Sequence, residues 1–73
     1  MRNGNILREI RLRRGISQVA LAARAGTTPA MISIIERYGH LPRPDLRRRI
    51  AEALGVAEAD IWPEVADDRA GRA

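Results

Sequence analysis

The sequence predicts a compact all-α domain of four to five helices. Glycines at positions 15, 26, 39 and 55 each follow a segment whose apolar residues recur at helical spacing, and glycine commonly ends a helix. A length of 73 residues allows one hydrophobic core and leaves no room for a second. Hydrophobic residues make up 45% of the chain but aromatic residues only 3%, so small aliphatic side chains must fill that core, as in packed helices.

The first two predicted helices are short. We expect the first to begin near Asn5, which can act as an N-cap, and to end at Arg14. The second follows Ser17, a favourable N-cap, and ends at Ala25. The side chains expected to face the core are Leu7 and Ile10 from the first helix and Leu21, Ala22 and Ala25 from the second.

The third helix has the clearest start signal in the chain. Thr28 is a favourable N-cap, and Pro29 follows at the first helical position, where the missing N–H group costs nothing. Ile32 and Ile35 are then expected to form the buried side of this helix.

The rest of the chain predicts a fourth helix, a short closing helix and a tail. The fourth helix spans residues 44–54, because its leucine and isoleucine side chains recur every four residues. Residues 56–62 form the closing helix, with Trp62 as a lid on the core and Pro63 as its stop. Residues 63–73 have almost no apolar side chains to bury, so we expect a flexible C-terminal tail there.

The second and third helices have the features of a helix-turn-helix. They are joined by residues 26–28, and a three- to four-residue turn with glycine is typical of two helices that cross steeply. Ala22 is small enough for a close crossing, and Gly26 can adopt a positive φ. With Ile32 and Ile35 facing inward, the opposite side of the third helix is free to enter a major groove.

Over about residues 5–62 the chain resembles the lambda-repressor and Cro-type helix-turn-helix family of transcriptional regulators. The matching residues, in register and without a gap, are Leu7, Ile10, Arg11, Gly15-Ile16-Ser17-Gln18, Leu21-Ala22, Gly26, Ile32, Ile35-Glu36 and Leu54-Gly55-Val56. The resemblance implies that residues 1–62 form a DNA-binding domain that regulates transcription, which we expect to be by repression. Tyr38 departs from the family pattern, which has an earlier glycine, so the third helix can run one residue longer.

The resemblance also implies a set of DNA-contacting residues. Gln18 is the expected phosphate contact at the start of the second helix, although a polar residue is common at any helix start. His40 and Arg43 are expected beside the DNA backbone, although a lone loop histidine is more often merely exposed. The positions expected to face base edges or nearby backbone are Thr27, Thr28, Pro29, Ala30, Ser33, Ile34 and Arg37.

Several of these residues are unusual for reading bases. Pro29, Ala30 and Ile34 have no side-chain donor, which predicts a modest sequence preference assisted by DNA shape. Ala30 and Ile34 can contact thymine methyl groups, while Arg37 can reach guanine or phosphate. The alternative is that this apolar strip binds a protein, as in an antitoxin or anti-repressor that uses the same fold.

Arg11 and Glu36 predict a structural ion pair. Arg11 lies four residues after Leu7, and Glu36 lies four after Ile32, so each charge borders an apolar stripe. A buried charge is costly unless it is paired, so we expect the two side chains to join the first helix to the end of the third. The family resemblance points the same way.

The charge of the chain favours a polyanionic partner. The formal net charge is +4, every basic residue is arginine, and about +5 belongs to residues 1–62. The run Arg47-Arg48-Arg49 is expected to be mostly a solvated face, because consecutive helical residues point about 100° apart. An RNA ligand is disfavoured because only one tyrosine and one tryptophan are available for stacking.

Other functional classes lack their usual residues. There is no cysteine and a single histidine, so we expect no catalytic site, no metal site, no cofactor and no small-molecule substrate. No segment resembles a signal peptide or a membrane span, so we expect a cytoplasmic protein. One domain of this size makes few contacts with DNA, so we expect two copies to bind a pseudo-palindromic operator as a homodimer. Its dimer surface could involve the fourth helix, the closing helix or the tail.

Overall fold

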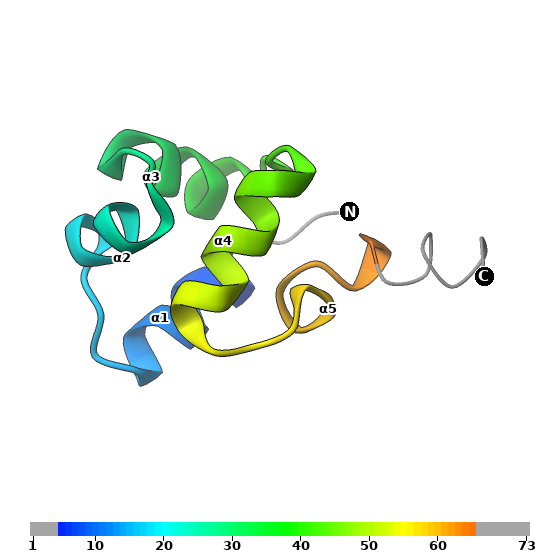
Figure 1. The fold of residues 1–73 in the computed structure, drawn as a ribbon, viewed down its shortest axis with the longest axis horizontal. Coiled ribbons are helices and arrows are strands. Elements are labelled where there is room, and N and C mark those ends of the chain that lie inside the picture. The colour runs from blue at the N-terminus through cyan, green and yellow to red at the C-terminus, as the bar shows by residue number, and fades with distance from the viewer. Residues whose placement is uncertain (1–4, 66–73) are drawn as a thin grey trace.

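Five α-helices follow one another along residues 5–65, which are the residues that the computed structural model describes (Figure 1). Their bounds are α1 Asn5–Arg13, α2 Gln18–Ala25, α3 Pro29–Tyr38, α4 Pro44–Leu54 and α5 Glu58–Ile61. Within this part of the chain there is no strand, so the all-α prediction is confirmed.

The N-caps of α2 and α3 are formed as the sequence predicts. The Ser17 hydroxyl oxygen accepts a hydrogen bond from the backbone N–H of Ala20 at 3.0 Å. The Thr28 hydroxyl oxygen accepts one from the backbone N–H of Met31 at 3.1 Å. Each bond satisfies a donor that a helix start leaves without a backbone partner, so these two side chains determine where α2 and α3 begin.

The helix ends differ slightly from the prediction. The helix α3 includes Tyr38, and Gly39 follows it with a φ of 68°. The helix α5 is shorter than the predicted range of residues 56–62, because the backbone N–H of Val56 bonds back to the Ala51 carbonyl oxygen at 3.0 Å. That bond belongs to the turn that closes α4, so α5 begins only after Ala57.

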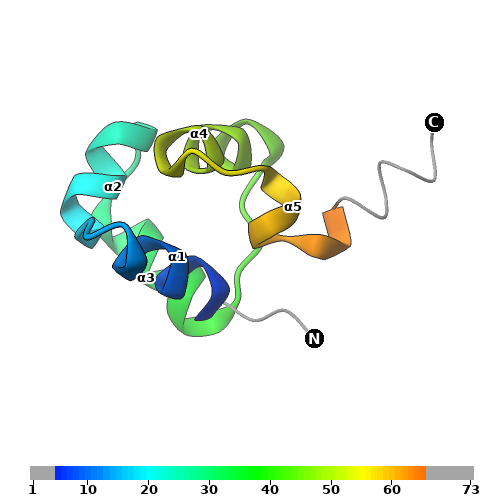
Figure 2. The ribbon, with the colours of Figure 1, turned by 90° about the horizontal axis from the view of Figure 1, so that it is seen from below.

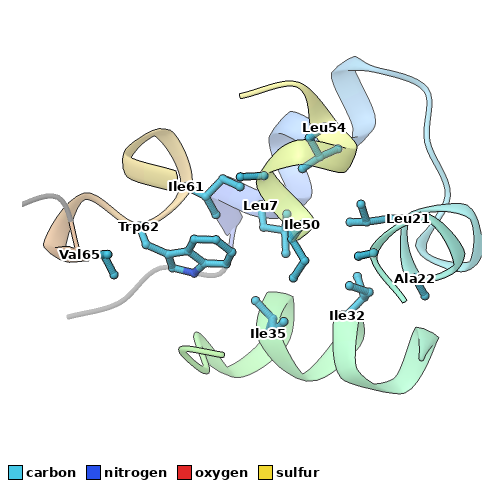
Figure 3. Close-up of a cluster of buried hydrophobic side chains, with 12 residues drawn as sticks. Leu7, Leu21, Ala22, Ile32, Ile35, Ile50, Leu54, Ile61, Trp62 and Val65 are labelled. Carbon is cyan, nitrogen blue, oxygen red and sulfur yellow. The ribbon is translucent and has the colours of Figure 1, made fainter. Parts of the chain in front are cut away.

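The core lies where the four longer helices meet (Figure 3). Its fully buried large side chains come from α1, α2, α3 and α4: they are Leu7, Leu21, Ile32, Ile35 and Ile50. The side chain of Trp62 extends from the end of α5 toward Leu7, and the residue is only 5% exposed. This position fits the expected role of Trp62 as a lid.

The folded part of the chain continues past the boundary predicted at residue 62. Residues 63–65 are helical, and Val65 is buried in the same core cluster. Pro63 does interrupt α5, which ends at Ile61, but a single apolar residue then returns to the core. The expectation of a flexible tail therefore does not hold for residues 63–65, and residues 66–73 lie outside the described range.

The helices are arranged so that α2 and α3 lie at one end of the molecule and α5 lies at the other (Figures 1 and 2). The helix α4 packs against α2 and contacts α5, while α3 packs against both α1 and α2. None of the helices in residues 5–65 is long and apolar enough to cross a membrane.

The arginine run on α4 is only partly a solvated face. Arg48 is exposed, as expected. Arg47 is half-buried, and its guanidinium donates to the Pro42 carbonyl oxygen at 2.7 Å and lies 3.7 Å from a Glu58 carboxylate oxygen. Because Pro42 precedes α4 and Glu58 begins α5, Arg47 links α4 to its neighbours on both sides.

Candidate functional site

The turn between α2 and α3 depends on a glycine. Gly26 has a φ of 69°, in the left-handed region that other residues rarely adopt, and its N–H group bonds to carbonyl oxygens in the last turn of α2. The N–H of Thr27 bonds to the Ala22 carbonyl oxygen at 2.9 Å. A Cβ atom at position 26 would also lie 3.4 Å from the Arg49 guanidinium. The chain therefore changes direction between α2 and α3 within residues 26–28.

The helix α3 is held to the core by one side only. Ile32 is 0% and Ile35 is 1% exposed, and both belong to the core cluster. The opposite side faces solvent: Thr28, Pro29, Ala30 and Arg37 are exposed, Ile34 is 40% exposed, and Ser33 is half-buried. Thr27, in the turn, is also half-buried. The structure thus leaves free the face of α3 that the sequence predicts to be free.

Arg11 and Glu36 form a buried ion pair between α1 and α3. The Arg11 Nε atom donates to Glu36 Oε2 at 2.7 Å, and Nη2 donates to Oε1 at 3.0 Å. The side chains are only 8% and 5% exposed, respectively. The hydrogen bond with Glu36 raises the pKa of the Arg11 guanidinium; burial lowers it, and the negative charge of Glu36 adds to the rise. The pair expected from the sequence is present, with two-point geometry.

Two further hydrogen bonds extend this ion pair into a network. Arg11 Nη1 donates to the Ile16 carbonyl oxygen at 2.9 Å, just before α2 begins. The side-chain amide nitrogen of Gln18 donates to Glu36 Oε1 at 3.1 Å. Gln18 is the first residue of α2, and Arg11 belongs to α1. The Glu36 carboxylate of α3 is therefore hydrogen-bonded to a side chain from each of these two helices. Gln18 is a predicted DNA contact, but its bond to Glu36 was not predicted, because residue spacing gives no sign of a contact between residues 18 positions apart.

An open depression of about 370 Å³ lies beside this network. It is lined by one residue of α1, one of α2 and three of α3: Arg8, Gln18, Ser33, Glu36 and Arg37. Arg8 and Arg37 are exposed, and neither makes an ion pair or a hydrogen bond within the described residues. Three predicted site residues, Gln18, Ser33 and Arg37, are therefore brought together. Arg8, which lies one helical turn before Arg11, lines the same depression and was not among the predicted site residues.

His40 and Arg43 lie at a different place from that depression. Both are exposed and line a second hollow of about 260 Å³ at the start of α4, together with Met31, Pro42, Asp45, Leu46 and Arg49. This hollow shares only Met31 with α3. Seven of the ten predicted contact residues therefore lie along α3 and the turn before it. Of the other three, Gln18 lies beside α3 at the depression, and His40 and Arg43 lie beyond its end.

The described residues contain no group of three or more His, Cys, Asp or Glu side chains that could hold a metal ion.

Among known protein families, the model of the helix-turn-helix family matches residues 7–61, which is most of the chain. No curated protein and no solved structure matches the sequence.

Proposed function

Because the chain belongs to the lambda-repressor and Cro-type helix-turn-helix family of DNA-binding transcription regulators, we propose that it represses transcription by placing α3 in the major groove of an operator. The observation that supports this most directly is the seating of α3. Ile32 and Ile35 are buried. On the other side, Thr28, Ala30 and Arg37 face solvent. A helix held in this way can enter a groove without unfolding any part of the core.

The polar residues of the proposed interface have different roles. Gln18, Arg37, His40 and Arg43 bind backbone phosphates, which fix the position of the domain on the duplex. Thr27, Thr28 and Ser33 hydrogen-bond to bases or to the nearby backbone. The Thr28 hydroxyl oxygen already accepts the Met31 N–H, so its remaining hydroxyl hydrogen makes it chiefly a donor to DNA.

The apolar residues contribute less specific contacts. Ala30 and Ile34 pack against thymine methyl groups, and Pro29 fixes the start of the helix close to the duplex. The sequence preference is therefore modest and depends partly on DNA shape. A two-fold dimer with half-sites about 34 Å apart adds the contacts that one domain lacks.

A second candidate function is supported by apolar side chains on the surface. Leu12, Val19, Ile34 and Tyr38 are between 40% and 73% exposed. They come from α1, α2 and α3, and the last two of these helices also carry residues of the proposed DNA interface. A protein partner that covered them would make the chain an antitoxin-like or anti-repressor-like module.

The test is selection of duplexes from a random pool, followed by equilibrium binding between about 50 and 200 mM salt. We expect the selection to enrich a two-fold symmetric sequence. We also expect the affinity for the selected duplex to fall steeply as the salt concentration rises. An RNA duplex of the same sequence is the control for nucleic-acid type. Absence of binding to any DNA duplex at low salt would exclude the proposed function and leave the protein-binding alternative.

A further inference from the structure

We propose that Arg8 of α1 is a further DNA contact, which binds a backbone phosphate over the depression that it lines with Gln18 and Arg37. This inference rests on the proposed function and deepens it, because it adds a third helix to the interface. In the sequence, Arg8 is one of several arginines on a charged helix face and has no distinguishing signal. Its position beside Gln18 and Arg37 appears only in the folded chain.

Four arginines in residues 5–65 lie within 4 Å of a carboxylate oxygen, and Arg8 is not one of them. Arg13 lies 2.7 Å from a Glu9 oxygen, and Arg47 and Arg49 each lie 3.7 Å from a carboxylate oxygen of Glu58 or Asp45. Arg8 and Arg37 have no such partner within residues 5–65, and both line the same depression. Two uncompensated guanidinium groups at one hollow favour an anion there.

The Glu36 carboxylate also lines this depression and must be accounted for. Its two oxygen atoms accept two hydrogen bonds from Arg11 and one from Gln18, so its charge is already balanced by a buried guanidinium. With Arg8 and Arg37 added, three positive charges surround one negative charge. Glu36 therefore holds Gln18 in place without cancelling the attraction of the hollow for a phosphate.

The place of the depression on the molecule fits a strand of the duplex. It lies where α1, α2 and α3 meet, beside the side of α3 that is free to enter the groove, and α1 runs close to α3 (Figure 2). When a recognition helix lies in the major groove, the helices packed beside it approach the flanking backbone. Gln18, which lines the depression, is also the first residue of α2, and the start of a helix favours negative charge.

The experiment compares Arg8→Gln with Arg48→Gln in equilibrium binding to the selected duplex across a salt series. Both variants remove one positive charge from an exposed arginine within a helix, but Arg48 lies on α4, outside the depression. We expect Arg8→Gln to reduce the slope of log affinity against log salt by about 0.9, and to weaken binding to selected and random duplexes by the same factor. Arg48→Gln should leave the slope unchanged, and Arg8→Lys should restore it.

The outcomes separate this inference from the proposed function. If the wild type binds DNA and Arg8→Gln has the same slope as Arg48→Gln, Arg8 is not a phosphate contact and the proposed function stands. If the wild type binds no duplex, the proposed function fails and this inference fails with it. Thermal melting of Arg8→Gln should match the wild type, since Arg8 makes no hydrogen bond within the described residues. A lower melting temperature would assign Arg8 a structural role instead.

Discussion

Replacing Arg11 with methionine should destabilise the fold strongly, because it leaves a buried carboxylate without its cation. The substitution removes two hydrogen bonds to Glu36 and one to the Ile16 carbonyl oxygen. Glu36 is only 5% exposed in its side chain and would keep a single bond, from Gln18. Removal of one partner from a buried pair costs about 3–5 kcal/mol. For a domain of this size the whole free energy of unfolding is about 4–11 kcal/mol, so the loss is a large share.

The assay is thermal unfolding followed by circular dichroism, with urea unfolding as a second measure. A loss of about 3 kcal/mol corresponds to a melting temperature roughly 12–24 °C lower in a domain of this length. Arg13→Met is the matched control, because it removes an ion pair to Glu9 whose side chains are 73% and 60% exposed. Such a pair contributes about 0–1 kcal/mol, so this variant should melt close to the wild type.

The double variant Arg11→Met/Glu36→Gln separates charge from packing. It removes the buried charge while keeping an oxygen that can accept the Gln18 bond. It should therefore recover a large part of the stability lost in Arg11→Met. If Arg11→Met melts within a few degrees of the wild type, or if the double variant recovers nothing, the reasoning about a buried unpaired carboxylate is refuted.

Three further predictions concern the turn, the cap and the pH dependence. Gly26→Ala should lose about 1–2 kcal/mol because its φ of +69° is strained for a side chain, and Gly15→Ala, with a φ of +65°, should lose about as much; melting temperatures equal to that of the wild type would contradict this. Thr28→Ala should cost about 1 kcal/mol through loss of the α3 N-cap, whereas Thr28→Ser should retain the cap, and urea unfolding of both variants provides the check. The pKa of Arg11 is raised in the folded state, so the stability that it contributes is fully present below the ordinary arginine pKa and is lost only as the pH rises through the higher folded value. The difference in unfolding free energy between wild type and Arg11→Met should thus stay constant from neutral to moderately alkaline pH, and a decrease in that range would argue against the ion pair.

The sequence predicted the parts of the fold that depend on local signals. The caps Ser17 and Thr28 and the helix-ending glycines act within a few residues of themselves, so spacing alone was sufficient to place α2 and α3. The start of α5 was placed too early, because Val56 is apolar and at helical spacing but its N–H group closes the preceding turn. Val65 was assigned to the tail because one apolar residue produces no periodicity.

The sequence predicted the part of the candidate site that lies on α3 but not the part that several helices form together. The outward face of α3 followed from the inward direction of Ile32 and Ile35, which a helical repeat determines. The depression could not be predicted, because it joins Arg8 to Gln18 and Arg37 across three helices. The role of Arg47 was missed for the same reason: its partners lie in the loop before α4 and at the start of α5. Residue spacing within one helix therefore does not predict which side chains meet between helices.

Trp62 gives this protein an internal optical probe with a defined location. It is the only tryptophan in the chain, and its indole is enclosed by the core. Exposure of the indole to water on denaturation shifts its fluorescence, so the emission spectrum reports directly on the opening of the end of the molecule that contains α5. A duplex on the outer side of α3 would not touch this ring, so a change in emission on adding DNA would report a change at the α5 end of the molecule, such as dimer formation there.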